Sequence, residues 1–93
     1  MDFSVKEVKR AQIGLLNEKI KEHDVSGEWL YNDCKKKIFD ELTADDTGKK
    51  FCFEKNEKNE LIAKYLKLRF DFDGFESEVK ELKNEIVVSV KWI

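Results

Sequence analysis

The sequence predicts an α+β domain in which an N-terminal helical hairpin packs on a three-stranded antiparallel sheet, in the order α-α-β-β-(α)-β. Two observations lead to this prediction: apolar residues have helical spacing in the N-terminal half, and they alternate or are β-branched in the C-terminal half. The chain has 93 residues, no proline and only four glycines, so we expect residues 1–93 to form one domain without linkers.

Two helices are expected in the N-terminal half. The capping box Ser-Val-Lys-Glu at positions 4–7 predicts a first helix over Val5–His23. Ser26 offers a second N-cap, and apolar residues recur every four positions after it, so a second helix is expected over Gly27–Leu42. Because the connector between the two is short, we expect an antiparallel helical hairpin.

Strands are expected after the turn residues of positions 43–48. The alternation in Lys49–Lys55 predicts a first strand. Leu66–Asp73 reads Leu-Lys-Leu-Arg-Phe-Asp-Phe-Asp, and this strict alternation predicts a half-buried strand with its apolar side toward the helices. Residues 60–65 fit either a helical turn or a strand, and because no turn residue separates them from the alternation, we expect one continuous strand with a bulge.

The last strand is expected over Ile86–Ile93. Its inward side chains should be Ile86, Val88, Val90 and Trp92. Apolar residues also occur on its other face, which predicts a central or covered strand. Between Gly74 and this strand, Phe75, Val79 and Leu82 recur at helical spacing and predict one or two helical turns.

Little in the sequence indicates catalysis or a cofactor. Cys34 and Cys52 are not at metal-ligand spacing, and we expect both to be reduced. His23, the single histidine, is expected to complement the dipole of the first helix. Asp71–Gly74 is similar to the middle of a calcium loop, but the twelfth position of such a loop would be Lys80 instead of a bidentate glutamate. We therefore expect no enzyme activity, no metal, no cofactor and no small-molecule substrate.

The composition narrows the class of protein. Charged residues make up 41% of the chain, and the net charge is −2, so no basic arm for nucleic acid is expected. The N-terminus leads directly into a charged helix and the apolar runs are short, which predicts a cytoplasmic protein with no membrane contact. A short, mildly acidic chain rich in Lys, Glu, Asn and Phe is typical of small inhibitors encoded by phages and other mobile elements, such as anti-CRISPR, antitoxin and immunity proteins; no motif carries this association.

The leading functional prediction is a non-enzymatic inhibitor or adaptor that binds another protein. Two acidic windows without basic residues, in positions 40–46 and 71–78, fit a basic partner surface such as the groove of a nucleic-acid-handling protein. The candidate contact residues are Asp71, Asp73, Phe75, Glu76, Glu78, Asp45 and Asp46.

Two alternatives remain open. One is a nucleic-acid-binding module with Phe51 and Phe53 as stacking platforms, although the near-neutral charge makes nucleic acid the less favoured partner. The basic residues of this alternative are Lys35, Lys36, Lys37, Lys49 and Lys50. The other is a structural or assembly subunit.

Overall fold

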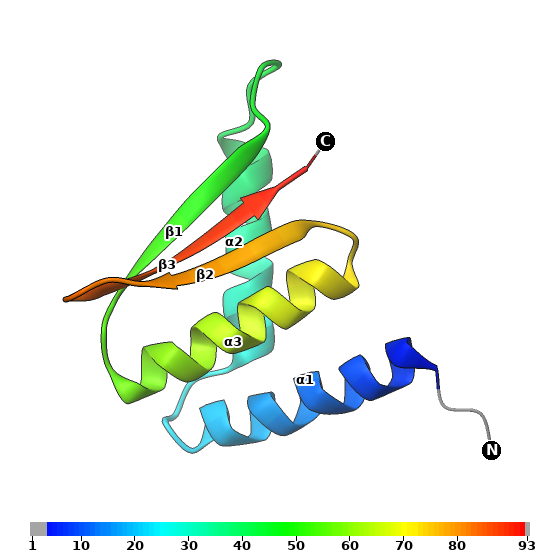
Figure 1. Cartoon of the computed structure of the whole chain (residues 1–93), viewed down its shortest axis with the longest axis vertical. Helices are drawn as coiled ribbons and strands as arrows, with labels where there is room; N and C mark the ends of the chain where they lie inside the picture. Colours follow the sequence, from blue (N-terminus) through cyan, green and yellow to red (C-terminus); the bar gives the residue numbers. More distant parts are fainter. Residues whose placement is uncertain (1–3, 93) are drawn as a thin grey trace.

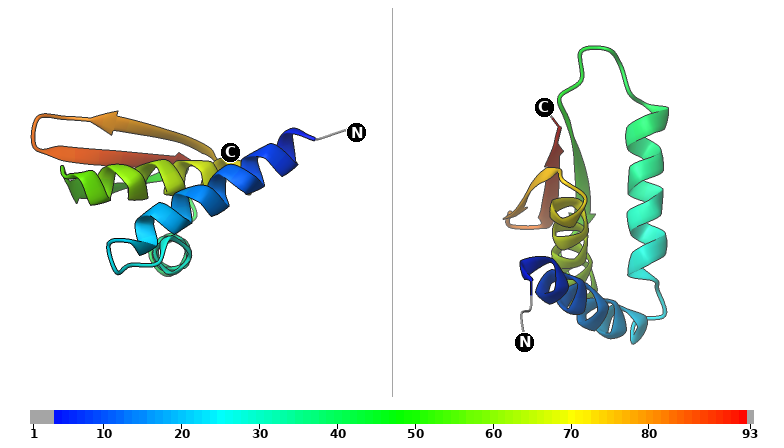
Figure 2. Two further views of the ribbon diagram at one scale, coloured as in Figure 1. Left: turned by 90° about the horizontal axis from the view of Figure 1, so that it is seen from below. Right: turned by 90° about the vertical axis from the view of Figure 1, so that its right-hand side faces the viewer.

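The computed structural model describes residues 4–92, which form three helices and one three-stranded antiparallel sheet (Figure 1). The elements are α1 (Val5–Lys21), α2 (Gly27–Asp40), β1 (Gly48–Glu54), α3 (Glu57–Phe72), β2 (Glu76–Glu81) and β3 (Glu85–Lys91). The helices lie on one face of the sheet, and the other face is open (Figure 2). The α+β class, the N-terminal helices and the three-stranded antiparallel sheet are confirmed.

The first two helices begin where the sequence predicts. The hydroxyl oxygens of Ser4 and Ser26 each accept a hydrogen bond from an amide in the first turn of the helix that follows. Gly27 starts α2 in close contact with α1 and α3, because a Cβ atom there would lie 2.9 Å from Asn17 Oδ1 and 3.0 Å from the Tyr65 ring. From this contact α2 leaves α1 at a steep angle, so the two helices cross instead of lying side by side as a hairpin (Figures 1 and 2).

The segment predicted as the middle strand is a helix. α3 covers Glu57–Phe72, so the predicted strand over Leu66–Asp73 and the bulged strand over residues 60–65 are both wrong. The side chain of Asn56 caps α3 by accepting a hydrogen bond from the Asn59 amide. Two glutamates in the first turn complement the helix dipole.

The alternating pattern has a different cause, which is that α3 is covered on two sides. Leu66 and Phe70 are fully buried in the core that α3 shares with the sheet. Leu68 and Phe72 are half-buried on the side of α1, where Leu68 lines a groove together with Leu16. A helix with apolar residues on two opposite sides shows no single stripe at a period of 3.6, and its sequence then imitates an alternating strand.

The segment predicted as helical turns is a strand. β2 pairs with β3, and the Leu82 amide donates to the Glu85 carbonyl at 2.8 Å across the tight turn that joins them. Gly74 has a φ of 95°, a conformation that favours glycine, and it connects the end of α3 to β2. The observed order is therefore α-α-β-α-β-β, with the third helix and the second strand exchanged relative to the prediction.

β3 is the central strand, since the strand order is β1-β3-β2. The prediction left a central or a covered last strand open, and the strand is central. Ile86, Val88 and Val90 are fully buried on the helix side, and Trp92 is half-buried beyond the end of the strand. Ile93, with which the predicted strand ended, lies outside the described residues.

One core joins all three helices to the sheet. The rings of Tyr31 and Phe70 lie 4.7 Å apart between centroids, and Phe51 stacks on Phe70 at 6.5 Å. These aromatic contacts connect α2, α3 and β1. The buried apolar residues are Ile20, Tyr31, Cys34, Ile38, Phe51, Ile62, Ala63, Tyr65, Leu66, Phe70, Ile86, Val88 and Val90.

Candidate protein-binding surface

The acidic window at positions 71–78 is divided by the structure, because its first aspartate is bonded inside the fold. Asp71 accepts hydrogen bonds from Ser77 Oγ at 2.5 Å and from Lys67 Nζ at 2.8 Å. Lys67 Nζ also donates to the Ser77 carbonyl at 3.1 Å. These three residues, which we call the α3–β2 latch, fasten the last turns of α3 to the first residues of β2. Asp71 is thus a structural residue.

Asp73 is also bonded within the chain. It caps the C-terminus of α3, and its carboxylate accepts a hydrogen bond from the hydroxyl of Tyr31 in α2. Burial raises the pKa of Tyr31 well above its ordinary value, and the bond to Asp73 and its negative charge raise it further. The Arg69 guanidinium lies 4.2 Å from the centroid of the Tyr31 ring and donates to Tyr65 at 2.8 Å. This cluster links α2 to the end of α3.

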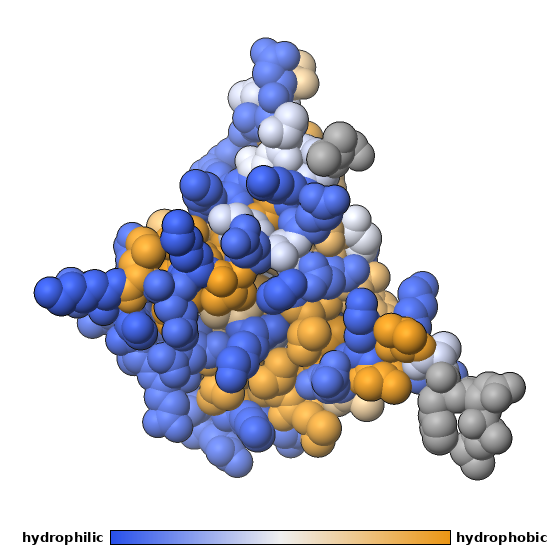
Figure 3. Space-filling model, viewed as in Figure 1, coloured by the Kyte–Doolittle hydropathy of each residue, from blue (hydrophilic) through white to orange (hydrophobic). Residues whose placement is uncertain are grey.

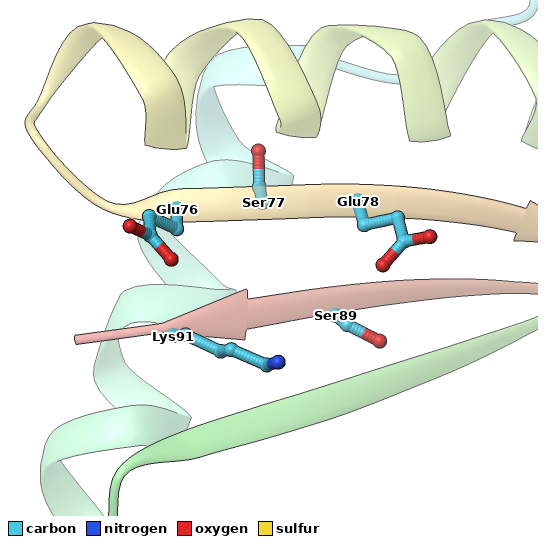
Figure 4. A pocket seen from close by; sticks show the side chains of 5 residues that line it. All are labelled: Glu76, Ser77, Glu78, Ser89 and Lys91. Atoms are coloured by element: carbon cyan, nitrogen blue, oxygen red, sulfur yellow. The ribbon is translucent and has the colours of Figure 1, made fainter. Parts of the chain in front are cut away.

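The remaining members of the window lie on β2 and just before it. Phe75 is half-buried, with its ring edge-to-face against Phe70 and Trp92, so it serves the core. Glu76 and Glu78 are exposed and line a small hollow with residues of β3 (Figure 4). In this view Ser77 points toward α3, whereas the two glutamates project from the open face of the sheet. Asp73 is exposed as well, but it is bonded to Tyr31, so these two glutamates are the exposed acids of the window that we consider as partner contacts.

The second acidic window lies in a separate loop at the same end of the sheet, where Gly48 of β1 and Glu76 of β2 both pair with Lys91 of β3. Asp45 and Asp46 lie in the exposed loop between α2 and β1, which projects beyond the sheet (Figure 1). The carboxylate of Asp46 accepts a hydrogen bond from the Thr43 amide at 2.9 Å and shapes this loop. Lys91 of β3 lies between the strand that this loop enters and the glutamates of β2, so a basic residue separates the two acidic windows.

The lysines of the alternative site point in different directions. Lys37 pairs with Asp33 at 3.2 Å, Lys49 pairs with Glu41, and Lys35 lies 5.4 Å from the centroid of the Tyr31 ring. Lys36 is exposed on α2. Lys50 lies on the open face of the sheet, where it lines a shallow hollow with residues of β2 and β3. Phe51 is buried and Phe53 half-buried, so neither offers a free stacking face.

The sequence did not predict an open groove between α1, α3 and β2, which we call the lysine-rimmed groove. Its apolar floor consists of Leu16, Leu68 and Val79, with Lys64, Lys67 and Glu81 at the rim. An adjoining hollow extends it along α1 past Leu15 and Lys19. In the space-filling view, hydrophobic residues gather over this part of the surface, where α1 and α3 lie in Figure 1 (Figure 3). Finding the groove requires knowing that residues 57–72 are helical.

An exposed apolar stripe runs along α1 beside this groove. Val5, Val8 and Leu15 are 71%, 51% and 66% exposed. They share one flank of the helix with Gln12 and Lys19, because positions 5, 8, 12, 15 and 19 follow helical spacing. This spacing is visible in the sequence, which does not show by itself which flank of the helix is covered.

The thiols occupy contrasting environments. Cys34 is buried in the core, and burial raises the pKa of its thiol to about 11. Cys52 is exposed on the open face of the sheet. Among residues 4–92, three or more metal-ligating side chains nowhere come together, and no helix has the length and apolar character needed to cross a membrane.

Comparisons with protein families, with curated proteins and with solved structures find no match to this chain.

Proposed function

We propose that this chain is a protein-binding domain that acts as an inhibitor or adaptor and has no chemistry of its own. The observation that carries the proposal is the exposed apolar stripe on α1, next to the lysine-rimmed groove. A neighbouring face of α1, with Ile13, Leu16 and Ile20, already packs on the core. The exposed parts of large apolar residues grouped on one flank of a helix contribute little to the stability of the isolated domain, whereas contiguous apolar surface is typical of interaction sites.

The contact that we propose is apolar at its centre and charged at its edge, as in most protein interfaces. Glu76 and Glu78 remain available for a basic patch of the partner, but they lie beside Lys91 and near Lys80 on the open face of the sheet. Their neighbours partly neutralise them, so this pair gives weaker support than the stripe on α1. The dispersed lysines give less support still for a nucleic-acid partner.

A site-specific photo-crosslinker tests the proposal. With the crosslinking residue in place of Leu15, irradiation in an extract of the source organism should give an adduct with a distinct protein. The double variant Val8→Lys and Gln12→Glu, made beside the crosslinker, should remove that adduct without changing the melting temperature, because both positions are exposed. The matched control places the crosslinker at Lys36, on the exposed side of α2.

The outcomes separate the functional classes. An adduct that forms from position 15 and not from position 36 supports a protein-binding domain. Adducts only between copies of this chain support an assembly subunit instead, and light scattering would then show an oligomer. Equal labelling from both positions, or none, contradicts the proposal.

A further inference from the structure

β2 is an edge strand whose outer side is unpaired by any other strand of the sheet. Because the Leu82 amide bonds to the Glu85 carbonyl, the hydrogen-bonded pairs with β3 fall on the even-numbered residues of β2. The backbone N–H and C=O groups of Ser77, Val79 and Glu81 therefore point away from β3. This direction agrees with the position of the Ser77 carbonyl, which accepts from Lys67 of α3.

The α3–β2 latch covers one end of this edge and leaves the rest open. The Ser77 carbonyl is occupied by Lys67, which protects the edge there as charged side chains commonly do. Val79 and Glu81 lie further along the strand and line the lysine-rimmed groove. The unpaired backbone N–H and C=O groups of β2 thus lie next to the apolar floor of the groove.

The apolar floor of the groove can receive the side chains of a fourth strand paired with β2. A residue paired with Val79 would exchange two backbone hydrogen bonds with it and point its side chain to the same side of the sheet, over Leu68 and Leu16. The next residue would face away from the helices. A partner strand therefore needs apolar residues at every second position.

The charges at the rim define the partner further. Lys19 and Lys64 are exposed, and neither takes part in an ion pair among residues 4–92. Lys67 is shared between the latch and the rim, and Glu81 is the single acid of the groove. The net charge at the rim is positive, so acidic residues flanking the apolar positions complement it.

We infer that the lysine-rimmed groove binds an extended segment of a partner protein, which adds to the free edge of β2 as a fourth strand. The segment has apolar residues at alternate positions and aspartate or glutamate beside them. This mode of recognition takes its affinity from main-chain hydrogen bonds and its specificity from pockets for alternate side chains. The inference rests on the proposed protein-binding function and specifies its site and ligand.

Selection from a displayed library of random twelve-residue peptides tests this inference without a known partner. The enriched peptides should alternate apolar and polar residues and carry acidic flanks. Hydrogen exchange of the wild-type protein with the best synthetic peptide should then slow at the amides of Val79 and Glu81, because these amides become paired. A helical ligand in the same groove would leave those two amides exchanging as in the free protein.

Three variants locate the contact, each measured by fluorescence anisotropy with the selected peptide. Val79→Pro removes an amide hydrogen from the free edge and none from the pairing with β3, so affinity should fall about tenfold while the sheet persists. Lys64→Glu should weaken binding several-fold, with a smaller effect at high salt. Lys36→Glu makes the same charge change on α2, outside the groove, and should leave affinity unchanged.

Enriched peptides with helical spacing, or unchanged exchange at Val79 and Glu81, would overturn strand addition. So would the absence of any enriched peptide. The two proposals fail differently: if a partner crosslinks from position 15 but binds the Val79→Pro and wild-type proteins equally, the protein-binding function stands and the fourth strand is wrong.

Discussion

Tyr31 donates its hydroxyl hydrogen to the carboxylate of Asp73, the residue at which α3 ends. An aspartate is unfavourable at a helix C-terminus, where the dipole is negative. Here the buried tyrosine gives that carboxylate a partner and joins α2 to α3. The position that looked like part of a binding surface in the sequence is therefore part of the framework.

Replacement of Tyr31 by phenylalanine should lower the free energy of unfolding by about 1–2 kcal/mol near neutral pH, because Asp73 loses its donor. The effect should depend on pH. The raised pKa keeps Tyr31 protonated in the folded state while the unfolded chain ionises above about pH 10. The stability contributed by the neutral hydroxyl is thus complete below pH 10 and is lost as the pH rises beyond it. Urea titrations of both proteins between pH 7 and 11 should show their difference shrinking only above pH 10; a difference that shrinks below pH 9 would contradict this assignment.

Phe70→Ala should cost about 3–5 kcal/mol, since the ring is fully buried between Tyr31, Phe51 and Phe75. Such a loss is a large part of the stability of a typical small domain. Phe72→Ala is the matched control, because Phe72 is only half-buried at the side of α1 and should cost clearly less. Denaturant midpoints measured by circular dichroism give the comparison, and similar losses for both would argue against the described burial of α3.

The two cysteines should differ in reactivity. With a disulfide reagent at pH 8, the native protein should release one equivalent of chromophore quickly, from exposed Cys52. Cys34 should react only after unfolding, because burial blocks access and holds its pKa near 11. Cys52→Ser should abolish the fast reaction. Two fast equivalents in the native wild type would show that the side of α2 that carries Cys34 is not packed on the core.

The α3–β2 latch should contribute to the stability of the edge strand more than to the core. Ser77→Ala removes the hydroxyl that bonds to Asp71 and should cost about 1 kcal/mol. Amide exchange should accelerate more in β2 than in the pairing of β1 with β3. Exchange that rises equally in every strand would mean that β2 opens only with the whole domain.

Reversal of Glu76 and Glu78 to lysine should leave the melting temperature nearly unchanged, because both side chains are exposed on the open face. If a partner has a basic surface, association should slow, and its dependence on salt should weaken. Surface-binding kinetics at two ionic strengths provide the measurement. Unchanged association would assign the contact to α1 and the groove alone.

Much of the fold can be predicted from the sequence, because the first two helices have N-caps and β1 and β3 have clear patterns. The exchange of α3 and β2 has a physical origin. Leu66 and Phe70 face the sheet while Leu68 faces α1, so the helix lacks the single apolar stripe that identifies most helices. The stretch from Glu60 to Phe70 without a turn residue, together with the cap at Asn56, is the better signal of a helix.

The candidate site was less accessible to sequence reasoning. The role of Asp71 depends on Ser77, which lies beyond the turn at Gly74. The role of Asp73 depends on Tyr31 of α2, and β1 and α3 lie between these two residues in the chain. The groove depends on the placement of α3, which the alternation obscured. In contrast, the stripe of Val5, Val8 and Leu15 follows from helical spacing alone and needed only the knowledge of which flank of α1 is covered.

The position of β3 between β1 and β2 has a consequence for synthesis on the ribosome. The two outer strands meet only through β3, yet both precede it in the chain. When α3 has left the ribosome and β3 has not, α3 carries apolar side chains on two sides, and the complete sheet that covers one of these sides has not yet formed. We therefore expect the emerging chain to remain a substrate for chaperones until Glu85–Lys91 have left the exit tunnel, and then to close its sheet in a single late step.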